Sequence, residues 1–455
     1  MHKFFLTLLS VSLFYYSNAQ TEIDALRYSR NDIVGTARFS AMAGAYGALG
    51  ADFTTLSYNP AGIGFYQFSE LTFTPSIGNV IATSYFGGGR NEDEKNHANF
   101  SNFGYVVSSP KSGNEWKRLN LAFGYNRTSN YKKRIFISGE NTNTSMIDNF
   151  VANAQGNTIG NLNSFTELLA WNTYLFDPLD TIDNGNYISN LNSSLSKKQE
   201  KVINSSGSAG EYVFSVGTSY EDRIYLGATI GMPSIDYYEK STYTESEFTD
   251  TAAHLESFVY DEELTTTGRG FNIKLGVIAR LNDWVRLGGA LHSPTFYDME
   301  DEYSTAITAV WSDSLGTKYD SSPFGYFNYE LKTPWKAIGS LAINIKKKGL
   351  ITADIEMIDY ASAKLNSETY KFTDENDVIK KITLASQNDD KILKQELVKQ
   401  IYAFSENRVI VVTDIGLSEN FLIYIDKIYN KSIDRKSEDY NKYLNLSKIK
   451  MVSNL

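Results

Sequence analysis

The chain has 455 residues, with 43 Lys and Arg against 53 Asp and Glu, no cysteine and a formal net charge of -10. The lack of thiols excludes a disulfide scaffold and a thiolate metal site, and the acidic balance argues against nucleic acid as a partner, since phosphate binding needs a basic surface. Aromatic residues make up 14% of the chain, which excludes a disordered composition, and a mean hydropathy of -0.32 excludes a bundle of membrane helices but allows a membrane barrel.

Residues 1–19 are predicted to be a secretory signal peptide. Lys3 supplies the positive charge near its start, residues 4–16 are apolar apart from hydroxyl side chains, and the small residue Ala19 suits cleavage before Gln20. A membrane anchor is the alternative, but this apolar stretch is short for a span of about 20 residues. No later stretch stays apolar for about 18 residues, so any insertion of the exported chain into a membrane is expected to use strands.

Residues 20–66 are predicted to fold as a compact plug. Small residues dominate positions 39–52, so the backbone segments can approach one another closely. Asn59-Pro60 breaks any helix and starts a turn. A glycine-rich linker is the alternative, but linkers of that kind lack large apolar residues such as Leu49.

Residues 67–375 repeat one pattern, in which large apolar residues alternate with small or polar ones. Between 119 and 126, Leu, Leu, Phe and Tyr alternate with Asn, Ala, Gly and Asn, and residues 271–281 follow the same rule. The side chains of a strand point alternately to its two faces, and a tight turn such as Asn282-Asp283 joins antiparallel neighbours. The second face carries Gly, Ala, Ser and Asn rather than many charges, which is typical of the interior of a barrel.

The predicted fold class is therefore all-β, an antiparallel transmembrane β-barrel over residues 67–375. Aromatic residues near the strand ends, such as Tyr125, Tyr212 and Trp284, fit girdles at two membrane interfaces. Long polar stretches, such as 139–208, alternate with short turns, as in barrels that have long outer loops and short periplasmic turns. A soluble β-sandwich or β-helix is the alternative.

Residues 160–176 form a helix-like apolar segment within the longest of these polar stretches. Residues three or four apart share one face of a helix, so the segment is expected to present an apolar stripe. The stripe either packs on the rim of the barrel or forms an exposed patch that captures a ligand. The residues that carry the capture hypothesis are Leu162, Phe165, Leu169 and Phe176.

Three basic residues, Lys274, Arg280 and Arg286, lie on or near inward-facing strand positions. They are candidate contacts for the head group of a ligand inside the lumen. The alternative is that they pair with inward-facing acids, of which Asp354 and Glu356 are the suitable partners, because buried charges are usually paired.

The sequence shows no arrangement of residues that indicates catalysis. The four His residues are dispersed, and the acid-rich stretch 245–263 lacks the spacing of a calcium loop, so no metal site is predicted. A nucleophile elbow, a P-loop and a dinucleotide-binding fingerprint are also missing. We therefore expect no catalytic residues, no cofactor and no enzyme activity.

Residues 376–455 differ in composition from the rest of the chain. All 8 Pro and 31 of the 32 Gly lie before residue 376, and residues 391–403 favour helix rather than strand. Apolar runs remain at 409–412 and 421–425, and Asn and Asp are still available for turns. This segment is predicted to be an atypical C-terminal part, a divergent or truncated barrel end that does not complete a regular barrel.

Two runs near the N-terminus resemble the hatch of the FadL/TodX family, outer-membrane transporters of long-chain fatty acids and other hydrophobic compounds. Residues 44–52 read Gly-Ala-Tyr-Gly-Ala-Leu-Gly-Ala-Asp, and residues 59–62 read Asn-Pro-Ala-Gly. The resemblance continues at 281–295, 331–335 and 353–360, so that it covers most of the chain before the atypical segment.

The resemblance implies a fourteen-stranded barrel that is closed by a small N-terminal hatch and releases its ligand sideways through a gap in the wall. It places the hatch motif of the family on Asn59, Pro60 and Ala61. The implied location is the outer membrane of a Gram-negative bacterium. The implied partners are a hydrophobic small molecule such as a long-chain fatty acid, outer-membrane lipid and the barrel assembly machinery, without nucleic acid.

Two other functions stay open at this point. One is a structural or adhesive outer-membrane barrel without transport, and the other is a secreted soluble β protein. Barrels of the family end in an aromatic residue that the assembly machinery recognises, whereas this sequence ends in Leu455. That difference adds to the expectation that the C-terminal segment is atypical.

Overall fold

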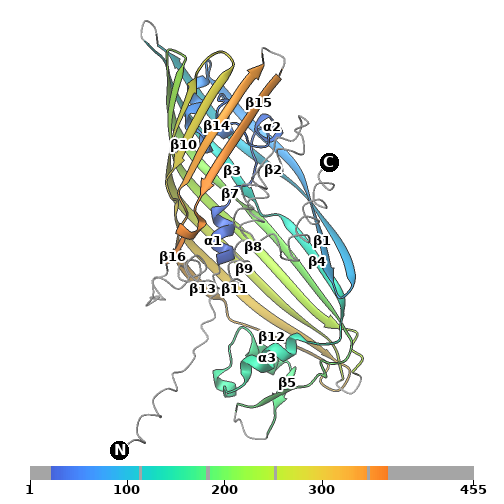
Figure 1. Ribbon diagram of the computed structural model, residues 1–455. Coiled ribbons are helices and arrows are strands. Elements are labelled where there is room, and N and C mark those ends of the chain that lie inside the picture. The colour runs from blue at the N-terminus through green and yellow to red at the C-terminus, as the bar shows by residue number, and fades with distance from the viewer. Residues whose placement is uncertain (1–21, 112–114, 181–184, 251–253, 346–348, 367–455) are drawn as a thin grey trace, which may run out of the picture. The chain divides into compact units, whose positions relative to one another are not determined.

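The computed structural model describes residues 22–111, 115–180, 185–250, 254–345 and 349–366. The predicted signal peptide and the C-terminal segment 376–455 lie outside the described residues. None of the helices in the described ranges is long and apolar enough to cross a membrane. The described chain consists of an N-terminal segment, one large antiparallel sheet and a layer of loop elements (Figure 1).

The large sheet contains fourteen strands, and all their pairings are antiparallel. The strands are β1 (Glu70–Phe86), β2 (Gly89–Pro110), β3 (Trp116–Asn130), β4 (Lys133–Asn141), β7 (Lys197–Tyr220), β8 (Ile224–Ser246), β9 (Leu255–Arg280), β10 (Val285–His292), β11 (Phe296–Trp311), β12 (Thr317–Ser321), β13 (Gly325–Lys332), β14 (Lys336–Ile345), β15 (Gly349–Ile358) and β16 (Lys364–Asn366).

Neighbours in the sheet follow the order β1-β2-β3-β7-β8-β9-β10-β14-β15. Several strands continue one another along the same line. β3 and β4 both pair with β7, and β10 and β11 both pair with β9. β11 and β14 each begin shortly after a proline, Pro294 or Pro334, because proline has no N–H to donate to the ladder.

The outer face of the sheet carries a band of exposed apolar side chains. On β9 the exposed side chains are Phe271, Ile273, Leu275 and Val277, and the next outward position is Arg269. β8 repeats this pattern from Ile224 to Met232 and then becomes polar. Aromatic residues mark both limits, with Tyr125 and Tyr212 at one and Trp116 and Trp284 at the other. We call this band the apolar belt.

The sheet curls around the N-terminal segment, which we call the hatch. Its elements are α1 (Glu22–Ser29), α2 (Ala37–Ala41), η1 (Phe53–Ser57) and η2 (Pro60–Phe65). On β3, Asn120 donates to the backbone oxygen of Ile63 at 2.7 Å, and on β15 the carboxylate of Asp354 accepts from the amide of Gly47 at 2.9 Å. Strands far apart in the sheet therefore contact the same plug, and the predicted fold class is confirmed.

The loop between β4 and β7 folds as a small layer against β9 and β11. It contains α3 (Met146–Ala154), η3 (Ile159–Asn161), α4 (Glu167–Asn172) and a separate two-stranded sheet of β5 (Phe176–Pro178) and β6 (Tyr187–Ser189). A last short helix, η4 (Tyr360–Ser362), precedes β16.

The predicted helix over residues 160–176 is correct only in its middle. The α-helix covers 167–172, because the side chain of Asn163 accepts from the amide of Phe165 at 2.9 Å and forms a turn in place of a helix start. Tyr174 ends it with a φ of 65°, in the left-handed region.

Candidate functional site

The Asn59-Pro60-Ala61 motif forms the start of η2 in the centre of the hatch. The Asn59 side chain is buried and caps this helix by accepting from the amide of Ala61 at 3.1 Å. Its amide nitrogen donates to the backbone oxygen of Gly47 at 2.7 Å and to that of Val277 at 3.3 Å. One side chain therefore joins two parts of the hatch to strand β9.

Two glycines in the sheet let this motif lie directly on the wall. A Cβ atom added at Gly276 would lie 2.0 Å from the side-chain oxygen of Asn59, and one added at Gly227 would lie 2.2 Å from the backbone oxygen of Pro60. The inward-facing glycines that the sequence pattern predicts for a barrel interior thus make room for the hatch.

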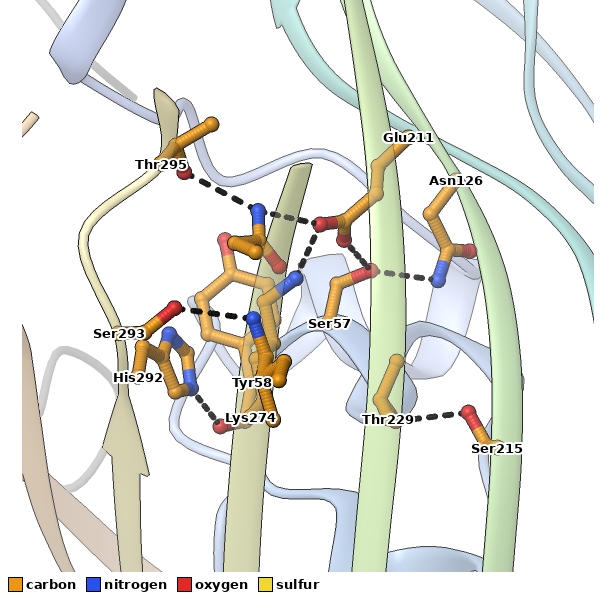
Figure 2. Close-up of polar contacts among 12 residues, drawn as sticks. Ser57, Tyr58, Asn126, Glu211, Ser215, Thr229, Lys274, His292, Ser293 and Thr295 are labelled. Atoms are coloured by element: carbon orange, nitrogen blue, oxygen red, sulfur yellow. Dashed lines mark hydrogen bonds and ion pairs between the residues drawn. The ribbon is translucent and has the colours of Figure 1, made fainter. Parts of the chain in front are cut away.

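A buried polar cluster around Glu211 gives the hatch a second attachment to the sheet (Figure 2). Lys274 forms an ion pair with one carboxylate oxygen of Glu211, and Ser57 of the hatch donates to the other at 2.9 Å. The side chain of Asn126 donates in turn to the Ser57 hydroxyl at 2.9 Å, and Asn272 donates to Glu211 at 3.0 Å. The cluster joins β3, β7 and β9 to one residue of η1.

A histidine adds a further contact beside this cluster. The Nε2 atom of His292 lies 2.6 Å from the backbone oxygen of Tyr58, next to Ser57 and Asn59 (Figure 2). His292 is on β10, so four strands of the sheet contact three consecutive hatch residues. Sequence analysis missed Glu211 and His292, although both occupy inward positions in the alternation of their strands.

The structure places Arg280 and Arg286 opposite each other in the ladder of β9 and β10, whereas Lys274 is opposite His292 and apart from them. Lys274 is paired with Glu211, Arg280 donates to Asp283 at 2.6 Å within the turn after β9, and Arg286 donates to a backbone oxygen of the hatch at 2.9 Å. The expected pairing with Asp354 and Glu356 is wrong, because nearer partners are available to each cation. Contact with a ligand head group stays a prediction.

The four residues of the capture hypothesis lie in the loop layer. Leu162, Leu169 and Phe176 are buried in its core, which packs against β9 and β11. Phe165 is half-buried, with its ring 5.0 Å from that of Tyr303. Three of the four therefore occupy the packed position that was the alternative to an exposed patch, and ligand contact stays a prediction.

The hatch, including its helix α1, packs against inward-facing side chains of the curled sheet. Helix α1 inserts Tyr28 among inward-facing tyrosines, and the guanidinium of Arg27 lies over the ring of Tyr237 at 4.4 Å. Inward residues packed with Tyr28 are Ala209, Ile235, Tyr237, Tyr297, Met299, Tyr329 and Leu331. A hollow of about 700 Å³ lies on β9, β11, β13 and β16, and none of the predicted site residues line it.

The wall itself is interrupted between β2 and the line of β3 and β4. The ladder of β2 with β3 ends at the pair Asn102 and Asn126, whereas β2 continues to pair with β1 up to Gly89. Among the described strands, residues 89–101 of β2 therefore have a ladder partner on one side only. We call this interruption the seam. It begins beside Tyr125, at the limit of the apolar belt that Tyr125 and Tyr212 mark.

Irregular backbone on both sides explains the seam. On β2 the register with β1 shifts at Ser101, opposite Pro75, which has no N–H to donate. On β3 the register with β7 shifts between Arg127 and Ser129. A bulge bends its strand and increases the local twist, so two bulges at the same level turn the two strands apart.

Side chains span the seam in place of backbone hydrogen bonds. Asn91 of β2 donates to the backbone oxygen of Ser138 of β4 at 2.8 Å, and Asp93 pairs with Arg134 at 3.1 Å. These contacts are few and separate, unlike the regular ladder of a paired edge. The seam can therefore widen without breaking any bond of a backbone ladder, which a paired part of the wall such as β7 and β8 cannot do.

Comparison with known proteins identified two solved structures. The crystal structure of the P. putida toluene transporter TodX matches with 11% identity and a TM-score of 0.36, over 74% of this chain and 73% of that one. A TodX deltaS2S3 mutant, described as a monoaromatic hydrocarbon channel, matches with 11% identity and a TM-score of 0.32, over 69% of each chain. No family model and no curated protein matches the chain.

Proposed function

We propose that this protein is a passive outer-membrane channel for hydrophobic small molecules, with long-chain fatty acids among its candidate ligands. The apolar belt supports a position in a membrane, because exposed apolar side chains at alternate positions are stable only against lipid or another apolar surface. The proposal includes export through the predicted signal peptide, and insertion by the barrel assembly machinery among outer-membrane lipids.

The observation that carries the proposal is the seam, which begins at the edge of the apolar belt, beside an interior that holds the hatch. A ligand that enters from the loop side meets the hatch on its way down the axis. At its belt end, beside Tyr125, the seam offers a shorter way out into the lipid around the belt. A hydrophobic ligand gains free energy on that step, about 25 cal/mol for each Å² of apolar surface removed from water, so no other energy source is needed.

The hatch contacts suggest how the channel is kept closed. Ser57 and Asn59 tie the hatch to β3, β7 and β9 through hydrogen bonds with the Glu211 cluster, with Gly47 and with Val277. These bonds are separate from the ladders of the sheet, so the hatch can shift without breaking the wall. In this proposal, Asn59, Pro60 and Ala61 form the part of the hatch that moves.

The loop layer is proposed to receive the ligand first. Phe165 and Tyr303 present half-buried rings at its boundary with β11, and the buried Leu162, Leu169 and Phe176 hold that boundary in place. The proposal requires no chemical change in the ligand and therefore assigns no catalytic residue.

Fractionation followed by ligand binding tests the proposal. The mature chain is expected in the outer membrane, soluble only in detergent, and the purified protein is expected to bind labelled oleyl alcohol with saturation. Recovery in the soluble periplasm or the medium would remove the membrane function and favour a secreted β protein. Membrane recovery without saturable binding would favour a structural or adhesive barrel. Mass spectrometry of compounds that copurify would identify the natural ligand.

A further inference from the structure

Two basic side chains of β2 face inward at the seam, beside a third from the β3–β4 break. Lys95 and His97 are on the inner face of β2, where the His97 ring covers Gly78 of β1. Lys132 lies between the end of β3 and the start of β4. Asn130, two residues before Lys132, contacts His97, and Lys95 bonds to Ser205, which is the ladder partner of Lys133. Lys95, His97 and Lys132 therefore form one cluster, the seam cluster.

The positive charge of the seam cluster is not neutralised by acids. The ammonium group of Lys95 donates to two neutral oxygens of β7, the side-chain oxygen of Asn204 at 2.5 Å and the backbone oxygen of Ser205 at 3.0 Å. Among the described residues, neither Lys95 nor Lys132 takes part in an ion pair, and the nearby acid Asp93 is paired with Arg134.

The histidine of the cluster has an unused polar atom. The Nε2 atom of His97 lies 2.7 Å from the side-chain nitrogen of Asn130, whereas its Nδ1 atom is buried without a hydrogen-bond partner among the described residues. A buried polar group without a partner costs about 1–3 kcal/mol, so a ligand that supplies the missing partner binds more tightly.

We propose that the seam cluster binds the anionic head group, a carboxylate or phosphate, of an amphiphilic ligand. This inference rests on the proposed channel function and names a ligand class for it. An anion beside Lys95 and Lys132 relieves the repulsion between like charges and gains charge-assisted hydrogen bonds. The apolar tail of the ligand then lies along the seam, toward Phe100 and Phe103, which are exposed on the outer face of β2.

The seam cluster differs in its partners from Lys274, the inward-facing cation that the sequence pattern favours. Lys274 is already held by Glu211 and Asn272 donates to the same carboxylate, so an incoming anion there would have to displace a buried partner. At the seam cluster an anion displaces only neutral acceptors. The structure therefore favours Lys95 and Lys132 over Lys274 as the head-group contacts.

The test uses three probes with the same chain and different head groups: oleate, oleyl phosphate and oleyl alcohol. The full-length protein in detergent is compared with the double variant Lys95→Gln/Lys132→Gln and with the control Lys240→Gln, which removes a cation paired with Glu263 at 2.7 Å elsewhere in the sheet. The glutamine at 95 keeps a donor for β7, and circular dichroism checks that all three proteins are folded.

The double variant is expected to bind the anionic probes about tenfold more weakly, with no change for oleyl alcohol and no change in the control. A loss confined to oleate identifies a ligand carboxylate, and a loss confined to oleyl phosphate identifies a membrane-lipid phosphate. Unchanged binding of both anions, or an equal loss for all three probes, would overturn the inference. Failure of the unmodified protein to bind oleyl alcohol would instead contradict the channel function.

Discussion

Two pairs of neighbouring strands in the same sheet behave differently. β7 and β8 form an uninterrupted ladder from Lys198 and Ser246 to Tyr220 and Ile224, whereas the ladder of β2 and β3 stops half-way along β2. Both pairs show the same alternation of apolar and small residues. The difference shows that side-chain patterning sets which face meets lipid, while bulges in the backbone decide where the wall is continuous.

In the continuous wall, Glu211 holds a buried ion pair with Lys274, and breaking this pair is expected to have the largest effect on stability. Replacing Glu211 with Gln leaves Lys274 buried without its charge partner, which typically costs about 3–5 kcal/mol. Urea unfolding in detergent measures this cost. Glu263→Gln, which breaks the exposed pair with Lys240, is the control and is expected to cost less than about 1 kcal/mol. Equal costs for the two variants would contradict the assigned role of Glu211.

A smaller loss of stability is expected from a substitution at the point where the hatch contacts the continuous wall. Gly276→Ala places a methyl group against Asn59 and the amide of Ala61, and such overpacking costs about 1–3 kcal/mol. Limited proteolysis of the hatch is expected to become faster in this variant. Gly339→Ala is the matched control, since no atom lies within 4 Å of the added Cβ. Similar proteolysis of the two variants would show that the hatch does not depend on this close approach.

Asn59→Ala is expected to act on transport more than on assembly. The variant loses the cap of η2, worth about 1 kcal/mol, and the two hydrogen bonds to Gly47 and Val277, but it leaves every ladder of the sheet intact. Uptake of a labelled hydrophobic compound is expected to fall several-fold at unchanged surface level, and Pro60→Ala is expected to behave in the same way. Normal uptake in both variants would reduce the motif to a turn.

Much of the fold could be predicted from the sequence, because alternation such as that of residues 271–281 has a direct physical meaning. The small residues and Asn59-Pro60 also indicated a compact N-terminal segment, and its role as a hatch stays a prediction. The seam was not predictable, since it depends on a register shift at Ser101 of β2, next to the pair of Phe100 with Pro75 of β1, and this pairing is set only when the two strands meet. The loop helix was overextended because the side chain of Asn163 competes for backbone amides.

The candidate site was predicted less well than the fold. Alternation along a strand identifies a side chain that faces the lumen, but the residue that this side chain binds comes from another strand, which the pattern of one strand does not reveal. Lys274 was therefore found without Glu211, and Lys95 was overlooked because its neighbours on β2 include acids such as Glu94, whose position on that strand faces outward. The atypical nature of residues 376–455 stays a prediction that heat-dependent migration on gels, a sign of a closed barrel, can test.

The central claim is that the ligand leaves through the seam and not through the continuous ladder of β7 and β8. The chain has no cysteine, so paired cysteines can be placed at Asn91 and Ser138 across the seam, and at Val202 and Thr242 within the continuous ladder of β7 and β8. Each pair is joined by a short thiol crosslinker in intact cells, and uptake of a labelled hydrophobic compound is measured. The account predicts that the crosslink across the seam blocks uptake and that the ladder crosslink has no effect. Normal uptake with the seam crosslinked would contradict it.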